Sequence, residues 1–302
     1  MAIIGDVARK VNENFLNLVK TAEGVEEFKE ETQNYLRLRL REEGFMRRIL
    51  QPQVLSLAEI DRAVDHKSPI KIIDIEPNPQ TPVAIPIDFR GGTEAQYVVG
   101  DRYAVTFYKI ETKEFQYREG DLLTIRMPIT QVLQEIMLKE IQWAEDYNFI
   151  KASDAAVNLT GQVVTSTNTI LQKKDLVDLF SKMATKFLKP EVVLMPYAMY
   201  IQILAWDYSA YGSELLKEVT IDGYKYTTLL GKRFIVSIKS DILNDKVAYA
   251  YTEPKFLGHA FTLEEDVKFD MQKEYDLIRF KSWETIGAAI GNANAVAKLV
   301  LA

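Results

Sequence analysis

Carboxylates gather in residues 264–276, among them Glu264, Glu265, Asp266, Asp270 and Asp276. Closely spaced carboxylates could bind a divalent cation or serve as a general acid and base. The same stretch also alternates apolar with polar side chains, in the order Val267, Lys268, Phe269, Asp270 and Met271. Such alternation is typical of a strand with one face in the core and one in water. We therefore predict a half-exposed strand and no enzyme. A metal-dependent enzyme that uses the Glu264–Asp276 carboxylates is the alternative.

Other residues with catalytic potential are few. The chain has no cysteine, which excludes disulfides, thiolate metal sites and cysteine nucleophiles. Its two histidines, His66 and His259, are too few to favour a multi-histidine metal centre or a catalytic triad. Gly231-Lys232 resembles a phosphate-binding loop only superficially, because Tyr226 and Arg233 occupy the places of the required glycine and Ser/Thr. The sequence predicts neither a cofactor nor a metal site.

Composition indicates a soluble globular protein. The 302 residues are 47% hydrophobic and 26% charged, which suits one large or two modest domains. No apolar run approaches the roughly 20 residues that cross a bilayer, and residues 1–6 do not resemble a secretory signal. The formal charge of −6 opposes association with nucleic acid, and a basic-aromatic platform is absent from the sequence. We expect a protein made in a cytoplasm.

Residues 67–126 carry the strongest indication of how the chain is organised. Apolar and β-branched runs at 70–75, 83–87 and 103–110 surround a proline-rich segment at 77–82 and a turn at Gly91-Gly92. This pattern predicts a long two-stranded arm with too few apolar positions to form a core. Because a projecting hairpin is unstable alone in water, we expect the arm to lie on a neighbouring subunit.

Helices are predicted on both sides of the arm. Residues 1–50 show apolar side chains at helical spacing, with a break at Gly24. Acids early and bases late in residues 25–50 favour compensation of the helix dipole over a basic binding face. After Pro128, apolar residues recur every three or four positions and predict a helix of roughly 20 residues, with Met137 and Trp143 in the core and Glu145 on its polar side.

The second half of the chain predicts a mixed α/β region, so the fold class is α+β. A polar loop is expected at 158–169, followed by a helix capped by Asp175, a buried strand at 192–196 and a helix at 197–206. Further strands are expected at 229–237, 246–251, 260–263, 267–271, 277–286 and 296–301.

This order of elements resembles the major capsid proteins of tailed bacteriophages with the HK97-like fold. Residues 276–287 (DLIRFKSWETIG), leading through Asn292 to residues 293–299 (ANAVAKL), look like the end of that family's chains. Residues 229–237 (LLGKRFIVS) are similar to the family's recurring G-x-P-V segment, although the proline is missing. Glu145-Asp146 resembles the end of the family's spine helix. The resemblance covers nearly the whole chain and rests on architecture.

The resemblance implies four parts. Residues 1–50 would be an N-terminal helical arm and residues 67–103 an extended β-hairpin loop. A peripheral domain with the spine helix would combine residues 51–66, 104–152 and 253–289. An axial α/β domain would combine residues 153–252 and 290–302.

The extended loop would then supply contacts between subunits. We expect Ile72, Ile85 and Val98 to be buried against the adjacent subunit, and Asp88 and Arg90 to form ion pairs with it. Gly91 and Gly92 would let the tip turn. For any one of these residues, an ordinary solvated hairpin is an equally good interpretation.

The function implied is that of a major capsid protein, a homo-oligomer of pentamers and hexamers that forms an icosahedral head around a double-stranded DNA genome. The expected partners are a separate scaffolding protein, favoured by Met1 at the start of the sequence, with portal and decoration proteins, and packaged DNA bound weakly and non-specifically. No membrane or cofactor is expected. The expected location is the virion capsid, after assembly in the host cytoplasm. The nearest alternative is the shell protein of an encapsulin-type nanocompartment.

Overall fold

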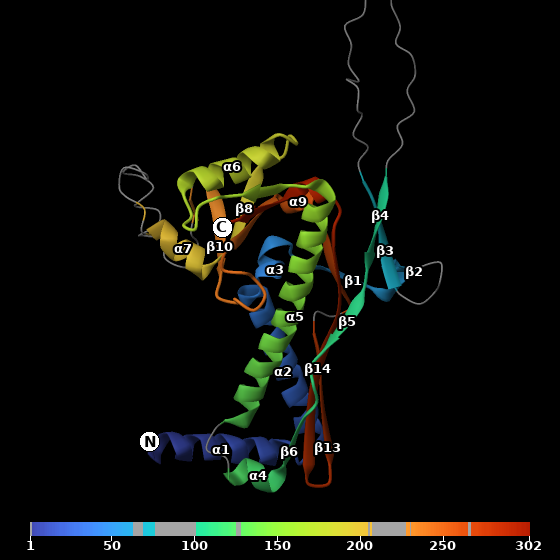
Figure 1. The fold of residues 1–302 in the computed structure, drawn as a ribbon. Helices are drawn as coiled ribbons and strands as arrows, with labels where there is room; N and C mark the ends of the chain where they lie inside the picture. The colour runs from blue at the N-terminus through green and yellow to red at the C-terminus, as the bar shows by residue number, and fades with distance from the viewer. Residues whose placement is uncertain are drawn as a thin grey trace, which may run out of the picture.

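The structure is a computed structural model that describes residues 2–62, 69–75, 101–124, 128–204, 206, 228–229, 231–264 and 267–302. In this part of the chain, helices and three β-sheets form a long body, and the smallest sheet projects from it (Figure 1). Among the described residues, helices of the length and apolar character needed to cross a bilayer are absent.

A single long helix, α5 (Ile129–Thr160, 32 residues), runs through the body and spans about 48 Å. It is longer than predicted, because Ala156 and Val157 remain apolar and pack into the core. The helix ends where Gly161 adopts a φ of 66°, so the predicted polar loop begins later than residue 158. Met137 is buried as predicted, whereas Trp143 is 42% exposed and the predicted core contact was wrong.

Helices α1 (Ala2–Leu18), α2 (Ala22–Glu43) and α3 (Phe45–Ile49) confirm the helical prediction for the N-terminal region. The chain breaks before Gly24, and Thr21 caps α2 by accepting a hydrogen bond from the Gly24 N–H at 3.1 Å. A Cβ on Gly24 would lie 2.1 Å from the carbonyl oxygen of Leu18. Glycine is therefore required by the tight corner between the two helices, not by a break at its own position.

The longest strand, β14 (Leu277–Ile290, 14 residues), organises the first six-stranded sheet. It pairs antiparallel with β12 (Gly258–Leu263) and β13 (Lys268–Glu274) on one side. On the other side it pairs antiparallel with β5 (Tyr108–Glu111) and β6 (Phe115–Arg118). Strand β1 (Gln53–Leu55) extends this sheet in parallel with β12. Phe269 and Met271 on β13 are buried, which confirms the predicted alternation.

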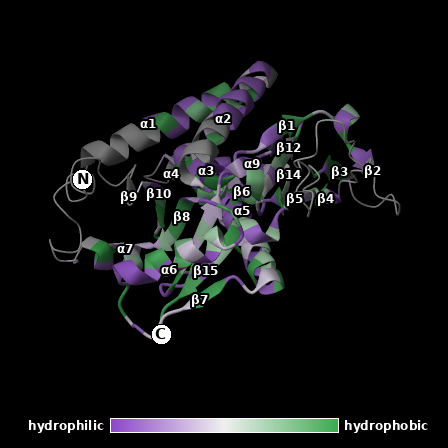
Figure 2. Cartoon of the chain, turned by 90° about the horizontal axis from the view of Figure 1, so that it is seen from above, coloured by the Kyte–Doolittle hydropathy of each residue, from purple (hydrophilic) through white to green (hydrophobic). Residues whose placement is uncertain are grey.

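The second six-stranded sheet has the order β7-β15-β11-β8-β10-β9. Its strands are β7 (Val163–Thr165), β8 (Pro190–Pro196), β9 (Thr228–Leu229), β10 (Lys232–Ser237), β11 (Val247–Thr252) and β15 (Val296–Val300). Helices α6 (Lys173–Ala184) and α7 (Tyr197–Leu204) cover one face through Val193 and Met195. Helix α5 covers the other face, where Leu194 and Tyr251 join the main core. Figure 2 shows hydrophobic residues in green on β8 within this layer.

The third sheet forms the base of the projecting arm, with β2 (Asp61–Arg62), β3 (Pro69–Asp74) and β4 (Arg102–Thr106) in antiparallel order. Short elements complete the described chain: the 3-10 helices η1 (Leu57–Glu59) and η2 (Ala293–Ala295), and the helices α4 (Glu119–Thr124) and α9 (Pro254–Leu257). The predicted strands at 70–75 and 103–110 are thus confirmed as β3, β4 and β5.

Candidate assembly surfaces and a buried ionic cluster

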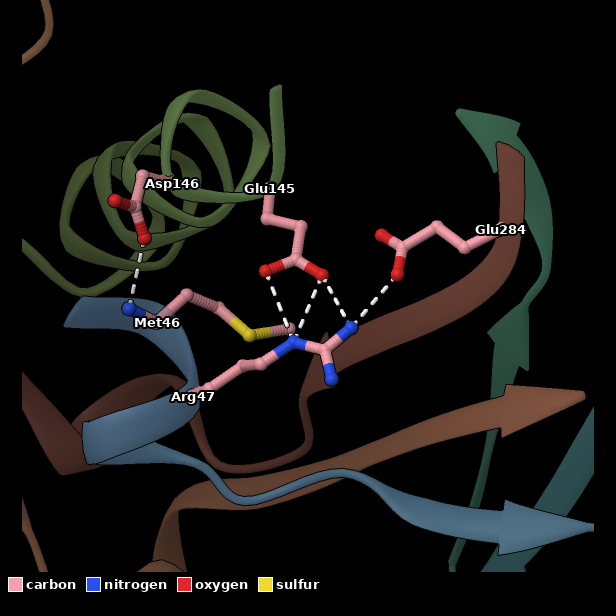
Figure 3. Close-up of polar contacts among 5 residues, drawn as sticks. All are labelled: Met46, Arg47, Glu145, Asp146 and Glu284. Atoms are coloured by element: carbon pink, nitrogen blue, oxygen red, sulfur yellow. Dashed lines mark hydrogen bonds and ion pairs between the residues drawn. The ribbon is translucent and has the colours of Figure 1, made fainter. Parts of the chain in front are cut away.

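A buried guanidinium joins three elements that are far apart in the sequence. Arg47 of α3 donates from Nε to the two carboxylate oxygens of Glu145 on α5 at 2.9 and 3.0 Å, and from Nη2 to Oε1 at 2.6 Å. Nη2 also donates to Oε2 of Glu284 on β14 at 2.7 Å (Figure 3). The side chains are 1% exposed for Arg47 and 0% for both glutamates. Two carboxylates therefore share one cation inside the core.

The next residue on α5 extends this cluster. Oδ1 of Asp146 accepts a hydrogen bond from the backbone N–H of Met46 at 2.9 Å, and Oδ2 forms an ion pair with Lys239 Nζ at 2.6 Å. Burial raises the pKa of Asp146 to about 6, although the Lys239 ammonium and the Met46 N–H act in the opposite direction. Lys239 follows β10, so the cluster links the N-terminal helices to the second sheet as well.

This cluster determines how α3 is oriented on the body. Removal of one member of a buried ion pair typically costs about 3–5 kcal/mol, because the other charge is left in a region of low dielectric. The sequence prediction placed Glu145 on the polar side of the helix and treated the late bases of residues 25–50, Arg47 among them, as dipole compensation. The spacing along the helix could have indicated that Glu145 is buried, since Ile141 and Phe149 lie four residues before and after it and are both buried.

The base of the arm is held by a small separate core. Val105, Phe107 and Phe261 are buried together, and Tyr103 packs against them. The Tyr103 hydroxyl lies 2.6 Å from Nδ1 of His259, so this histidine has a hydrogen-bonding partner that sequence reasoning did not find. Burial lowers the pKa of His259 and raises the pKa of Tyr103. Both shifts favour the neutral pair, and the contact is structural.

Contact between Tyr103 and Gly291 is close. A Cβ on Gly291 would lie 2.5 Å from the Tyr103 ring. The ring therefore rests directly on the glycine backbone, which fixes the direction in which the arm leaves the body.

Only one of the predicted contact residues of the extended loop lies in the described part of the chain. Ile72 on β3 is 41% exposed and pairs with Ala104 of β4, which is also exposed. Ile75, just beyond β3, is exposed too. Ile72 and Ala104 are thus exposed together on one face of the arm, next to the exposed Asp74–Arg102 ion pair, and Ile75 lies out of step with that face. Ile85, Asp88, Arg90, Gly91, Gly92 and Val98 lie outside the described residues, as does His66.

The carboxylates of residues 264–276 do not form a metal centre among the residues described. Glu264 forms an ion pair with Lys268 at 2.8 Å, and Asp270 forms one with Lys29 at 2.9 Å. Burial acts to raise the pKa of Asp270, but hydrogen bonds from Lys29 and Gln272 outweigh it and hold the pKa below its usual range. Groups of three or more metal-ligating side chains are absent from the described residues, and Glu265 and Asp266 lie outside them.

Comparison of the sequence with known proteins gives no match to a family model and none to a curated protein. Solved structures do match the fold. The capsid of cyanophage P-SCSP1u has a TM-score of 0.58 and 9% identity, over 84% of this chain and 86% of that one. The capsid of a native GTA particle has a TM-score of 0.55 and 12% identity, over 85% and 89%. The chain has a phage capsid fold.

A third match is a virus-like particle from Pyrococcus furiosus, with a TM-score of 0.51 and 13% identity, over 90% of this chain and 99% of that one. The capsid fold therefore extends over nearly the whole length of each chain compared. These matches confirm the predicted α+β, HK97-like fold class. Each of the three matched structures is described as a capsid or a virus-like particle.

Proposed function

We propose that this chain is the major capsid protein of a tailed bacteriophage and assembles into pentamers and hexamers that close around a double-stranded DNA genome. The observation that carries the proposal is the likeness to capsid structures over more than four-fifths of the chain. Because the identities are low, the likeness supports the architecture and not any particular site.

The arm supplies the physical reason for assembly. In the described part of the arm, Ile72 and Ile75 are exposed apolar side chains, and a projecting hairpin is unstable alone in water. Placing the arm on an adjacent subunit would bury these side chains in an obligate interface, typically larger than about 2,000 Å². In this proposal Ile85 and Val98 extend the apolar contact, Asp88 and Arg90 form ion pairs with the neighbour, and Gly91 and Gly92 turn the tip.

The proposed parts follow the domain limits predicted from the sequence, and α5 crosses the limit between residues 152 and 153 as one helix. A scaffolding protein, a portal and decoration proteins would complete the particle. The formal charge of −6 suits weak, non-specific contact with packaged DNA. Assembly would take place in the host cytoplasm, and no cofactor is required.

A second candidate is the shell of an encapsulin-type nanocompartment that holds protein cargo. The likeness to the Pyrococcus furiosus virus-like particle favours it. The two candidates differ in what the shell encloses: a phage head protects DNA from nuclease, whereas a nanocompartment retains protein.

The test combines sedimentation with negative-stain microscopy on the chain expressed alone and with a candidate scaffolding protein. We expect closed shells or rings of five and six copies, and loss of closure when residues 82–100 are deleted. Ile72→Asp should also abolish assembly, because a buried carboxylate replaces an apolar contact. Lys113→Asp, at an exposed position outside the arm, is the control and should assemble. A monomer or dimer under both conditions would refute the proposal.

A further inference from the structure

The C-terminal end of α6 exposes a strained aromatic residue. Phe187 has a φ of 59°, in the left-handed region, and its side chain is 100% exposed. Two hydrogen bonds define a Schellman motif here: Phe187 N–H donates to the Ala184 carbonyl at 3.0 Å, and Leu188 N–H donates to the Met183 carbonyl at 3.3 Å. Glycine is the usual residue at this place in the motif, so phenylalanine adds strain and no packing within the chain.

An apolar hollow of about 480 Å³ lies beside Phe187. It is lined by side chains from the outer face of α6 and the segment that leads into β8, including Val177, Phe180, Leu188 and Pro190. Val177 is exposed, and Phe180 and Leu188 are half-buried. The hollow and Phe187 together form one continuous apolar surface, which we name the α6 patch.

The charged side chains that line the α6 patch are both lysines, Lys189 and Lys232. Burial lowers the pKa of Lys232, and the nearby Lys189 ammonium lowers it further, while Glu191 acts weakly in the other direction. Among the described residues, neither lysine lies within ion-pair distance of a carboxylate. Two like charges thus stand beside an apolar surface on a chain whose net charge is negative.

These charges disfavour one occupant of the patch and favour another. A second copy seated on the same surface by two-fold symmetry would bring Lys189 and Lys232 towards their own counterparts, which is unfavourable. A segment with carboxylates beside apolar side chains would satisfy both features. We propose that the α6 patch docks an acidic amphipathic helix of a different protein, with its apolar side chains in the hollow and its carboxylates against Lys189 and Lys232. The proposal does not depend on shell assembly.

The test uses the full chain in its unassembled state and two fluorescent probe peptides. One is an amphipathic helix of about four turns with leucine on one face and glutamate on the other, and its match has lysine in place of every glutamate. Fluorescence anisotropy should show binding of the acidic peptide at least tenfold tighter than binding of the basic one, and weaker binding as salt is raised.

Two variants separate docking from folding. Lys189→Glu with Lys232→Glu should weaken binding of the acidic peptide about tenfold. The same change at Lys113 and Lys139, exposed lysines outside the patch, should leave binding unchanged. Phe187→Gly should weaken binding severalfold without lowering the melting temperature, because it relieves strain and removes no intrachain packing.

Three results would overturn the proposal. The first is the absence of binding by the acidic peptide, and the second is equal binding of both peptides. The third is self-association of the chain that Phe187→Gly abolishes while peptide binding is absent, which would assign the patch to a second copy.

Discussion

Replacing Arg47 with methionine would remove the cation that Glu145 and Glu284 share in the core. Arg47 makes three contacts with Glu145 and one with Glu284, all between 2.6 and 3.0 Å, and the three side chains are essentially inaccessible to water. Methionine fills much of the volume of the arginine stem, so the cavity left behind is small. The main effect is therefore electrostatic, because two carboxylates lose their counter-charge in a region of low dielectric.

The expected loss in the free energy of unfolding is about 3–5 kcal/mol. This is a large share of the roughly 5–15 kcal/mol by which domains are stable.

Urea denaturation followed by circular dichroism measures this loss. Arg48→Met is the matched control, since Arg48 is adjacent and half-buried, and it should cost less than about 1 kcal/mol. Adding Glu145→Gln and Glu284→Gln to Arg47→Met should recover part of the stability, because the uncompensated charges are removed. Equal losses for the two arginine variants, or no recovery in the triple variant, would refute the reasoning.

Two further changes test other parts of the structure. The folded-state pKa of Asp146 is raised to about 6. The native chain should therefore lose about 2 kcal/mol relative to Asp146→Asn as the pH rises from about 4 to about 7. Urea denaturation across that range measures the difference, and a constant difference would contradict the assigned pKa. Gly24→Ala should lower the melting temperature although alanine is the better helix former, because its Cβ would lie 2.1 Å from the Leu18 carbonyl oxygen. The control is Gly120→Ala in α4, which should not lower the melting temperature because a Cβ there meets nothing within 4 Å. Equal shifts in the two variants would mean that the corner between α1 and α2 can relax.

Much of the fold could be predicted from periodicity. The strands at 192–196, 246–251, 260–263, 267–271 and 296–301 each correspond to an observed strand within a few residues, because alternation or continuous apolar character reports burial directly. A helix begins at Ile129 as predicted, but the prediction placed its end too early. Polar residues such as Asn158 suggested a loop, while the buried face of α5 continued through Val157.

The ionic cluster and the exposed aromatics could not be predicted in the same way. Glu145 is charged and Trp143 is apolar, so residue type alone assigns them to the wrong sides of α5. Glu145 is buried because Arg47 faces it. Trp143 lies at the surface, where its ring stacks on Tyr147 with the ring centroids 5.0 Å apart. Such partners come from distant parts of the chain, and a single sequence does not reveal them. The expected contacts of the arm depend on residues beyond the described ranges and remain predictions.

The positions of β14 and β15 near the end of the chain determine how late in synthesis the fold can be completed. β15 lies inside the second sheet, between β7 and β11, and Arg47 meets Glu284 across 237 residues. At translation rates of about 5–20 residues per second, the N-terminal helices wait roughly 10 to 50 seconds for β14 to be made. Before β14 is made, the arm has no completed first sheet to pack on. Before β15 is made, one edge of β11 has no partner strand. The topology therefore acts as a test of completeness, since a chain cut short before β14 lacks the strand on which the base of the arm packs, and one cut short before β15 leaves an edge of β11 unpaired.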